Sequence, residues 1–203
     1  EIFELTPLKP TVHYIQRDQA SEYFRVFWPN DLQVEDQGTV YEARAPLAMI
    51  WELNNVEGYS QLRPQEYDRF RHTVPFTRTL ELLNVKYVLS NSSVAWLSNQ
   101  PPVFSSGDVS VFRTPSYLPR AFIVHQWRGT NSEEVLDVLA QPSFSPANEV
   151  LLEGAPPPSP PEPRGDSTPG STEFVSHQPE EIDISVYLSS EGVLVLSEPY
   201  FPG

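Results

Sequence analysis

The stretch that decides the fold class reads Thr73-Val74-Pro75-Phe76-Thr77-Arg78-Thr79-Leu80-Glu81-Leu82-Leu83-Asn84-Val85-Lys86-Tyr87-Val88-Leu89. Phe76, Leu80 and Leu83 recur at the spacing of one helical face, after a proline that suits the start of a helix. Asn84 is a plausible stop, and Val85–Leu89 is rich in residues that favour strands. A short helix that runs directly into a strand predicts an α+β fold.

The pattern is less regular toward the N-terminus. Residues 23–28 alternate between two faces, which is typical of a half-buried strand, and residues 39–44 predict a short second strand. Residues 51–72 mix aromatic and charged residues without a clean period, so we expect a loop with short helical turns there. After a turn at residues 106–108, another strand is predicted at residues 109–113.

Strand patterns dominate the C-terminal part. Residues 121–127 and 149–153 are predicted strands, and Thr130 with Glu133 matches a capping box that would start a helix between them. Farther on, residues 182–188 alternate in polarity and residues 193–196 are apolar throughout. A turn at Glu191 and Gly192 predicts that these last two segments form a hairpin.

The composition changes abruptly near residue 155. Residues 155–172 hold seven prolines and almost nothing apolar, which is typical of a flexible linker or a long loop. We therefore expect an α+β part at residues 1–115. A mainly β, sandwich-like part that stops before the sandwich is complete is expected at residues 116–203, with the proline-rich loop inside it.

Composition also bounds the function. The 203 residues, of which 39% are hydrophobic, suffice for one domain or two small ones. Twenty-seven acidic against thirteen basic residues give a net charge of -14, which repels nucleic acids and anionic membranes, so we exclude a nucleic-acid role. Without cysteine there is no disulfide framework. The apolar runs are too short to span a bilayer.

We identify no catalytic motif and predict no catalytic residue, metal site or cofactor. No spacing typical of metal ligands links the four histidines, His13, His72, His125 and His177. His125, inside an apolar segment, is interpreted as a hydrogen-bonded core residue. The densest acidic cluster, at Glu180, Glu181 and Asp183, is interpreted as solvated surface. A hydrolase that uses this cluster is the weakest alternative.

Loop aromatics and amides are the candidate binding residues. Tyr59 lies beside Asn54 and Asn55, and Trp96 is flanked by serines in a predicted loop. An aromatic ring offers a flat apolar face to a sugar or a protein partner, and an amide supplies hydrogen bonds. These four residues would form the contacts of a binding module, whereas we expect Trp127 to pack in the core.

Four blocks of sequence carry a resemblance to a known family. They are, in chain order, Gly58-Tyr59-Ser60 followed by Tyr67, Leu82-Leu83-Asn84-Val85-Lys86-Tyr87-Val88-Leu89, Leu118-Pro119-Arg120-Ala121-Phe122-Ile123-Val124, and Leu194-Val195-Leu196-Ser197-Glu198-Pro199-Tyr200-Phe201-Pro202-Gly203. In this order the blocks resemble the extracytoplasmic C-terminal region of bacterial YfhO-like membrane proteins. The resemblance covers most of residues 22–203.

The resemblance implies a function for the parent protein. Members of the family look like polytopic glycosyltransferases that use lipid-linked sugar donors, and no position here matches their catalytic acid. It therefore implies a non-catalytic domain on the extracytoplasmic face of a bacterial cell membrane that shapes acceptor or partner access. The implied partners are the parent's membrane domain and, through the parent, a cell-envelope glycan or polyprenyl-linked sugar. The start at Glu1, without a Met or a signal segment, fits an excised piece.

Two further expectations follow. In the family pattern, strands beyond the final Pro-Gly complete a β-sandwich, whereas this sequence stops at Gly203. Residues 193–196 would then be an unpaired apolar strand, through which the chain would form a homodimer. The main alternative to a membrane-protein domain is a free-standing secreted module that binds carbohydrate or protein.

Overall fold

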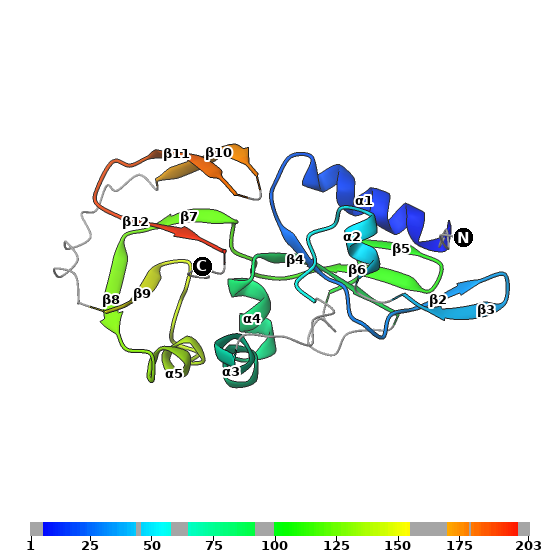
Figure 1. Cartoon of the computed structure of the whole chain (residues 1–203), viewed down its shortest axis with the longest axis horizontal. Coiled ribbons are helices and arrows are strands. Elements are labelled where there is room, and N and C mark those ends of the chain that lie inside the picture. The colour runs from blue at the N-terminus through cyan, green and yellow to red at the C-terminus, as the bar shows by residue number, and fades with distance from the viewer. Residues whose placement is uncertain are drawn as a thin grey trace. The chain divides into compact units, whose positions relative to one another are not determined.

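The computed structural model describes residues 6–43, 46–57, 65–91, 100–154, 170–178 and 180–198 (Figure 1). The fold is α+β, as the sequence predicts, with helices and several small open sheets. The chain divides into two compact units, of which unit 1 comprises Glu1–Gln65 and Thr79–Leu118, and unit 2 comprises Glu66–Arg78 and Pro119–Gly203. No helix among the described residues combines the length and apolar character that crossing a bilayer requires.

Unit 1 is built around a four-stranded sheet. Its elements are η1 (Thr6–Leu8), α1 (Lys9–Gln19), β1 (Arg25–Phe27), β2 (Gln33–Asp36), β3 (Thr39–Glu42), α2 (Leu47–Ile50), β4 (Val85–Ser90), β5 (Phe104–Ser106) and β6 (Val109–Arg113). The strand order is β1-β4-β6-β5, with β1 parallel to β4 and the other neighbours antiparallel. Val111 and the next residue, Phe112, belong to different buried clusters, so both faces of the sheet are covered.

Helix α1 covers one face of this sheet. Leu8, Val12 and Ile15 are buried and recur at helical spacing, so one stripe of the helix enters the core. The Tyr14 ring stacks on Phe104 of β5 with their centroids 4.7 Å apart. The sequence therefore fixes the helix to the sheet through apolar contacts on a single face.

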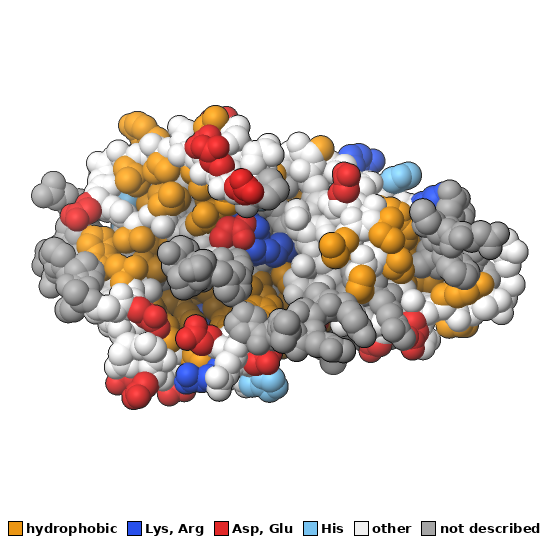
Figure 2. Space-filling model, viewed as in Figure 1, with side chains coloured by type: hydrophobic (Ala, Val, Ile, Leu, Met, Phe, Trp, Pro, Cys, Tyr) orange, Lys and Arg blue, Asp and Glu red, His pale blue; other side chains and the backbone are white. Residues whose placement is uncertain are grey.

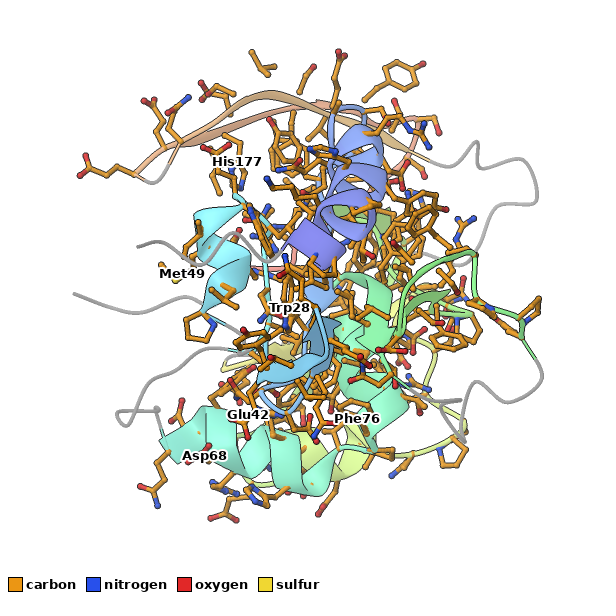
Figure 3. All side chains as sticks on the ribbon, turned by 90° about the vertical axis from the view of Figure 1, so that its right-hand side faces the viewer. Trp28, Glu42, Met49, Asp68, Phe76 and His177 are labelled. Carbon is orange, nitrogen blue, oxygen red and sulfur yellow. The ribbon has the colours of Figure 1, made fainter. Side chains whose placement is uncertain are left out.

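Trp28 forms the centre of the larger cluster. Its side chain is fully buried, its Nε1 donates a hydrogen bond to the Ala43 carbonyl at 2.6 Å, and its ring centroid lies 5.7 Å from that of Trp51. Figure 3 shows Trp28 among the other side chains of the unit, whereas Met49 of α2 points outward. The indole thus satisfies its one polar group while it fills the core.

The predicted strands of unit 1 are present, with shorter bounds in two cases. The strand expected at residues 23–28 is β1, and that expected at 39–44 ends as β3 at Glu42. β3 pairs with β2 through a hairpin whose turn residues, Gln37 and Gly38, have φ of 50° and 80°. Two positive φ values are typical of a type I′ turn, which matches the twist of the flanking strands.

The described residues of unit 2 form three pairs of strands. Its elements are α3 (Gln65–Thr73), β7 (Ala121–Val124), β8 (Gln126–Thr130), α5 (Val135–Leu139), β9 (Glu149–Glu153), β10 (Ser171–His177), β11 (Ile182–Tyr187) and β12 (Val193–Leu196), while α4 (Phe76–Leu82) crosses the division between the units. β8 is parallel to β9, whereas β10 and β11, and likewise β7 and β12, are antiparallel.

The predicted hairpin of residues 182–188 with 193–196 is wrong. β11 pairs with β10, and β12 pairs with β7. A Cβ added at Gly192 would lie 3.0 Å from Ile123 Cγ2 and 3.1 Å from the Val124 carbonyl oxygen. The chain therefore passes close against β7 instead of turning back onto β11. β12 is not unpaired, so the expected homodimer loses its structural premise, although association of two chains stays a prediction.

Three other predictions need correction. The segment at residues 121–127 is not one strand, because β7 and β8 have different partners and meet at His125. The region at residues 51–72, expected to be a loop with short helical turns, contains most of the nine-residue helix α3, whose side chains are at most half-buried and so give only a weak apolar face to detect. The turn before α5 is capped by Asn131, not Thr130, because Asn131 Oδ1 accepts the N–H groups of residues 133 and 134.

The proline-rich loop was expected to extend to residue 172. Residues 155–169 lie outside the described residues, and β10 already begins at Ser171. Thr172 Oγ1 donates a hydrogen bond to the Ala121 carbonyl at 2.9 Å, which fixes the start of β10 beside β7. The predicted loop is therefore too long at its C-terminal end.

Candidate functional site

The most concentrated set of ionisable groups surrounds Lys86, the second residue of β4. This lysine is only 5% exposed although it lies between the apolar residues Val85 and Tyr87. A buried ammonium group is costly unless anionic partners and hydrogen bonds compensate for the lost water. The surroundings of Lys86 must therefore supply negative charge.

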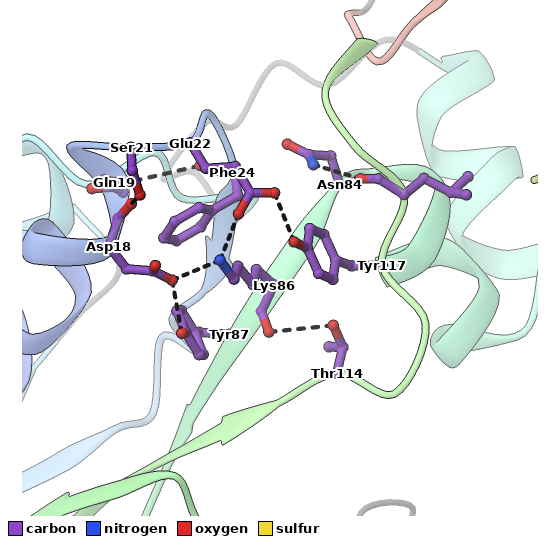
Figure 4. Close-up of polar contacts among 11 residues, drawn as sticks. Asp18, Gln19, Ser21, Glu22, Phe24, Asn84, Lys86, Tyr87, Thr114 and Tyr117 are labelled. Carbon is purple, nitrogen blue, oxygen red and sulfur yellow. Dashed lines mark hydrogen bonds and ion pairs between the residues drawn. The ribbon is translucent and has the colours of Figure 1, made fainter. Parts of the chain in front are cut away.

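Two carboxylates supply it (Figure 4). Lys86 Nζ lies 2.7 Å from Asp18 Oδ2 and 2.6 Å from Glu22 Oε2. Asp18 is in the last turn of α1, and Glu22 follows the end of that helix. The ammonium group thus joins the C-terminal end of α1 to β4, one of the two inner strands of the sheet.

Tyrosine hydroxyls complete the hydrogen bonding of both carboxylates. Tyr87 Oη donates to Asp18 Oδ2 at 2.8 Å, and Tyr117 Oη donates to Glu22 Oε1 at 2.6 Å. The ring centroids of Phe24, Tyr117 and Tyr87 lie 4.8, 5.5 and 5.7 Å from Lys86 Nζ. We call these six residues the Lys86 cluster. Aromatic faces at this range attract a cation and also shield it from water.

The backbone around Lys86 is held as firmly as its side chain. Thr114 N–H donates to the Lys86 carbonyl at 2.9 Å, and Thr114 Oγ1 donates to the Val85 carbonyl at 2.6 Å. Just before the strand, Asn84 has a φ of 58° and donates from Nδ2 to the Leu118 carbonyl at 2.6 Å. Asparagine tolerates this left-handed conformation better than most residues, so Asn84 directs the chain into β4.

These contacts fix the charge states of the cluster. Partial burial raises the pKa of Asp18, but hydrogen bonds from Lys86 and Tyr87 lower it by more, so the net pKa lies below its ordinary value. Burial lowers the pKa of Lys86, but Asp18 and Glu22 raise it to a net value above the ordinary one. Burial and a carboxylate partner raise the pKa of both Tyr87 and Tyr117.

The directions of these pKa shifts determine what the cluster can do chemically. The pKa of Lys86 is raised, which keeps its amine protonated and unsuited to nucleophilic attack at neutral pH. Both tyrosines remain hydrogen-bond donors, and Asp18 remains an acceptor. The arrangement suits a permanent connection between α1 and β4 better than proton exchange near neutral pH, where a general acid or base would need a matched pKa.

A second charged cluster lies in unit 2. Arg120 Nη2 and Glu198 Oε1 form an ion pair, and His177 Nε2 lies 3.6 Å from the same carboxylate oxygen. Burial lowers the pKa of Arg120, and the charge of Glu198 opposes this effect. Ser197 N–H donates to the Arg120 carbonyl at 2.8 Å. These contacts join the residue before β7 to the residues after β12.

The structure places the predicted binding residues differently. Tyr59 and Trp96 lie outside the described residues. Asn55 is occupied within the fold, because its Oδ1 accepts from Trp28 N–H at 2.9 Å and its Nδ2 donates to the carbonyls of Trp28 and Glu57 at 3.2 and 2.8 Å. Asn54 is exposed, and its carbonyl accepts from Val26 N–H at 2.7 Å. Asn55 thus holds its loop against β1.

The other residues considered for chemistry in the sequence analysis do not come together in one site. Among the described residues, no three His, Asp or Glu side chains come together in a way that could hold a metal ion. His125 is half-buried and its Nδ1 lies 2.8 Å from the Glu191 carbonyl oxygen. Glu180, Glu181 and Asp183 are exposed, and Asp183 accepts a hydrogen bond from Ser176 at 2.9 Å. Trp127 is buried, as expected.

Sequence reasoning missed the Lys86 cluster, although one signal was present. Lys86 is the only charged residue within the apolar run Val85–Leu89. A lysine at such a position predicts a buried charge with acidic partners. It does not predict which of the 27 acidic residues supply them, because Asp18 and Glu22 are more than sixty positions away.

Comparisons with known proteins do not assign the chain to a family. No family model matches the chain, and neither a curated protein nor a solved structure is significantly similar to it.

Proposed function

We propose that this chain is a non-catalytic extracytoplasmic domain of a YfhO-like, glycosyltransferase-like membrane protein of bacteria. In this proposal the domain shapes the access of an acceptor or a protein partner, while the chemistry resides elsewhere in the parent protein. The proposal takes up the resemblance of the four sequence blocks. The contacts that these blocks make support it.

The observation that carries the proposal is the junction between two of the blocks. Block 118–124 contains Arg120 and β7, and block 194–203 contains Glu198 and most of β12. The two strands pair, and the ion pair joins residues 78 positions apart in sequence. Residues that make such a specific long-range contact are a more informative basis for resemblance than scattered surface residues, because a chance match has no reason to select both partners.

Block 82–89 makes a comparable contact with block 118–124. Asn84 donates to the Leu118 carbonyl, and Lys86 of the same block is the centre of the Lys86 cluster. The resembling residues thus hold the fold together in both units. This fits a role for the domain as a scaffold.

Sequencing the gene on both sides of this segment tests the proposal most directly. We expect several apolar stretches of about 18 or more residues in the same reading frame, which is the length needed to span a bilayer. Protease treatment of spheroplasts should then digest the domain from outside the intact cell membrane. A reading frame without such stretches, or a domain protected in spheroplasts and cleaved only after lysis, would contradict it.

A free-standing secreted binding module remains the second candidate. The observation that favours it is the exposed aromatic and aliphatic surface on β11, where Tyr187 is 67% exposed. The same gene sequence distinguishes the two candidates, because a secreted module requires a signal peptide and a stop codon without bilayer-spanning stretches.

A further inference from the structure

The C-terminal segment, residues 170–198, docks on the short strand β7. Its last strand, β12, pairs antiparallel with β7 over all four residues of both strands. At the start of β10, Thr172 Oγ1 donates to the Ala121 carbonyl, although these two residues are 51 positions apart in sequence. After the end of β12, Ser197 N–H donates to the Arg120 carbonyl at 2.8 Å. The segment is therefore held to β7 near both of its ends.

Two glycines of the C-terminal segment lie against the side chain of Ile123 in β7. A Cβ added at Gly170 would lie 3.0 Å from Ile123 Cγ1, and one added at Gly192 would lie 3.0 Å from Ile123 Cγ2. A backbone approaches a neighbour this closely only where it carries no side chain of its own. The segment and β7 therefore have complementary shapes as well as paired backbones.

The C-terminal segment also has hydrogen bonds of its own. Within it, β10 and β11 form an antiparallel ribbon, and Gln178 N–H donates to the Glu181 carbonyl at 2.8 Å in the turn between the two strands. A ribbon followed by one strand is a contiguous supersecondary unit, and such units open cooperatively. The segment can therefore leave β7 as a whole.

Docking of the C-terminal segment buries few apolar side chains. None of its described residues is fully buried, and Val175, Tyr187 and Leu194 are 69%, 67% and 40% exposed. Figure 2 shows hydrophobic side chains at the surface over the part of unit 2 that carries β10, β11 and β12. Detachment of the segment therefore exposes little additional apolar surface, and it requires less free energy than opening the buried clusters of unit 1.

The sequence between β9 and the C-terminal segment allows a second location for the segment. Residues 155–169 make this connection, and seven of these fifteen residues are proline. A proline-rich connection of this length reaches up to roughly 45 Å when it is extended. That reach is comparable with the size of a small domain, so the segment can contact the β7 of a neighbouring chain as well as its own.

We propose that residues 170–198 exchange between two copies of this chain, so that β12 of each copy pairs with β7 of the other. The exchanged contacts are the same as those within one chain, so no new interface is needed. A tethered segment competes at an effective concentration on the order of millimolar, so the exchanged dimer forms near that protein concentration once the segment has been opened. The inference goes beyond the proposed function and does not rest on it, because exchange requires only the contacts of unit 2.

Single cysteines report the exchange, because the natural chain has none. One variant of the whole chain carries Ala121→Cys and another carries Leu196→Cys, at positions directly opposite each other in the β7–β12 pair. The two variants are mixed at a concentration on the order of millimolar, in high salt that screens the repulsion between acidic chains. They are opened briefly in dilute urea, returned to buffer and oxidised. We expect a disulfide-linked dimer of the two variants, because opposite residues of antiparallel strands have Cα atoms about 5 Å apart, within the reach of a disulfide.

Two controls make this measurement specific. In the first, Val124→Cys replaces Ala121→Cys, because Val124 is also buried on β7 but lies opposite Val193. We expect about tenfold less linked dimer with this variant, since its sulfur lies beyond the reach of a disulfide to position 196. In the second, one chain carries both Ala121→Cys and Leu196→Cys and is oxidised at high dilution. It should form a disulfide within itself, which shows that the two substitutions preserve the strand pair.

Three outcomes would overturn the proposal. Equal amounts of linked dimer with Ala121→Cys and Val124→Cys would mean that the disulfide does not report strand exchange. If the doubly substituted chain forms its disulfide but the mixture gives no linked dimer, the C-terminal segment does not exchange. Native mass spectrometry tests the unsubstituted chain in the same way, after it is opened with an isotope-labelled copy. We expect dimers that contain one chain of each kind, and finding only monomers would exclude exchange without reference to any substitution.

Discussion

Unit 1 and unit 2 hold their strands together in different ways. In unit 1, two clusters of buried apolar side chains cover both faces of one four-stranded sheet. In unit 2, the described strands form three separate pairs, and most apolar side chains on them are only half-buried. Trp127 and Phe144 are the largest buried side chains described in unit 2.

In unit 2, polar contacts contribute to holding the strands together, as buried apolar side chains do in unit 1. Thr172 fixes β10 to β7, His125 contacts the Glu191 carbonyl, and Arg120 pairs with Glu198. The same α+β chain is thus stabilised by apolar burial in unit 1, whereas directed polar contacts set the register of the strands in unit 2. An apolar side chain removed from unit 1 leaves a cavity, whereas the more open unit 2 relaxes or admits water.

The largest effect is expected from Trp28→Ala in unit 1. The substitution removes a fully buried indole and its hydrogen bond to Ala43, and should lower the free energy of unfolding by about 4 kcal/mol. Trp127→Ala in unit 2 should cost about half as much. Urea denaturation measures the total loss, and hydrogen exchange of peptides from each unit shows where protection is lost.

Met49→Ala serves as the control for this pair. Met49 is exposed on α2, so its truncation should change the free energy of unfolding by less than about 0.5 kcal/mol. If Trp28→Ala and Trp127→Ala lowered the free energy of unfolding equally, the two units would be equally tightly packed. That result would contradict the difference between them.

Lys86→Met should have the next largest effect. It leaves Asp18 and Glu22 without their shared cation, and removing one partner of a buried ion pair costs about 3 to 5 kcal/mol. Both carboxylate side chains are about one third exposed, so solvent reduces this and we expect about 2 kcal/mol. Adding Asp18→Asn and Glu22→Gln to the variant should recover part of the loss in urea denaturation.

The pH dependence of this loss has a defined sign. The pKa of Asp18 is lowered in the folded state, so its contribution is present above the unfolded value of about 4 and is lost as the pH falls through the folded value. The pKa of Lys86 is raised, so its contribution is present below about 10.4 and is lost as the pH rises through the folded value.

The stability difference between the native protein and Lys86→Met should therefore be constant from about pH 5 to pH 9 and shrink at both extremes. Thermal unfolding at a series of pH values measures it. A difference that grows on acidification would contradict the charge states assigned to the cluster.

Local patterns predicted strands β1, β3, β4 and β6 of unit 1 and most strand segments of unit 2, but they did not predict how the strands of unit 2 pair. The helix before β4 and the strand itself were predicted because their apolar residues follow one period. Helix α1 was not predicted, although the stripe of Leu8, Val12 and Ile15 carries the same kind of signal. Helix α3 was missed because none of its side chains is fully buried. Its signal is electrostatic, with acidic residues in the first turn and Arg71 and His72 in the last.

Long-range pairing was not predictable in the same way. The apolar pattern of residues 193–196 indicates a strand but not its partner, and nearness in sequence favoured β11 over β7. The partners of Lys86 were equally unpredictable. The sequence indicates that Lys86 is a buried charge, but nothing distinguishes Asp18 and Glu22 from ordinary surface acids. The binding residues Asn54, Tyr59 and Trp96 stay predictions, and Asn55 has a structural role.

Gly192→Ala probes one of the two tightly packed glycine positions described in unit 2. The added Cβ would lie 3.0 Å from Ile123 Cγ2 and 3.1 Å from the Val124 carbonyl oxygen, and the backbone of β7 cannot yield as a flexible side chain does. We expect a loss of about 1 to 2 kcal/mol, with reduced exchange protection in β7 and β12 only. Ser185→Ala, at an exposed position of β11, is the matched control and should be neutral. A neutral Gly192→Ala would mean that the β7–β12 pair shifts freely.

Glu149→Gln should have the smallest effect, although it removes a visible ion pair. Glu149 Oε1 lies 3.2 Å from Arg128 Nε, and the Arg128 side chain is about half exposed, so the pair gains little over its hydration in water. We expect a change below about 0.5 kcal/mol that disappears at high salt in urea denaturation. The Arg120–Glu198 pair is the informative contrast, since its arginine side chain is only 10% exposed and Glu198→Gln should cost more than Glu149→Gln. If Glu149→Gln cost as much as Glu198→Gln, exposed and buried ion pairs would stabilise unit 2 equally. The register of its strands would then rest on charge in general and not on the directed contacts at Arg120.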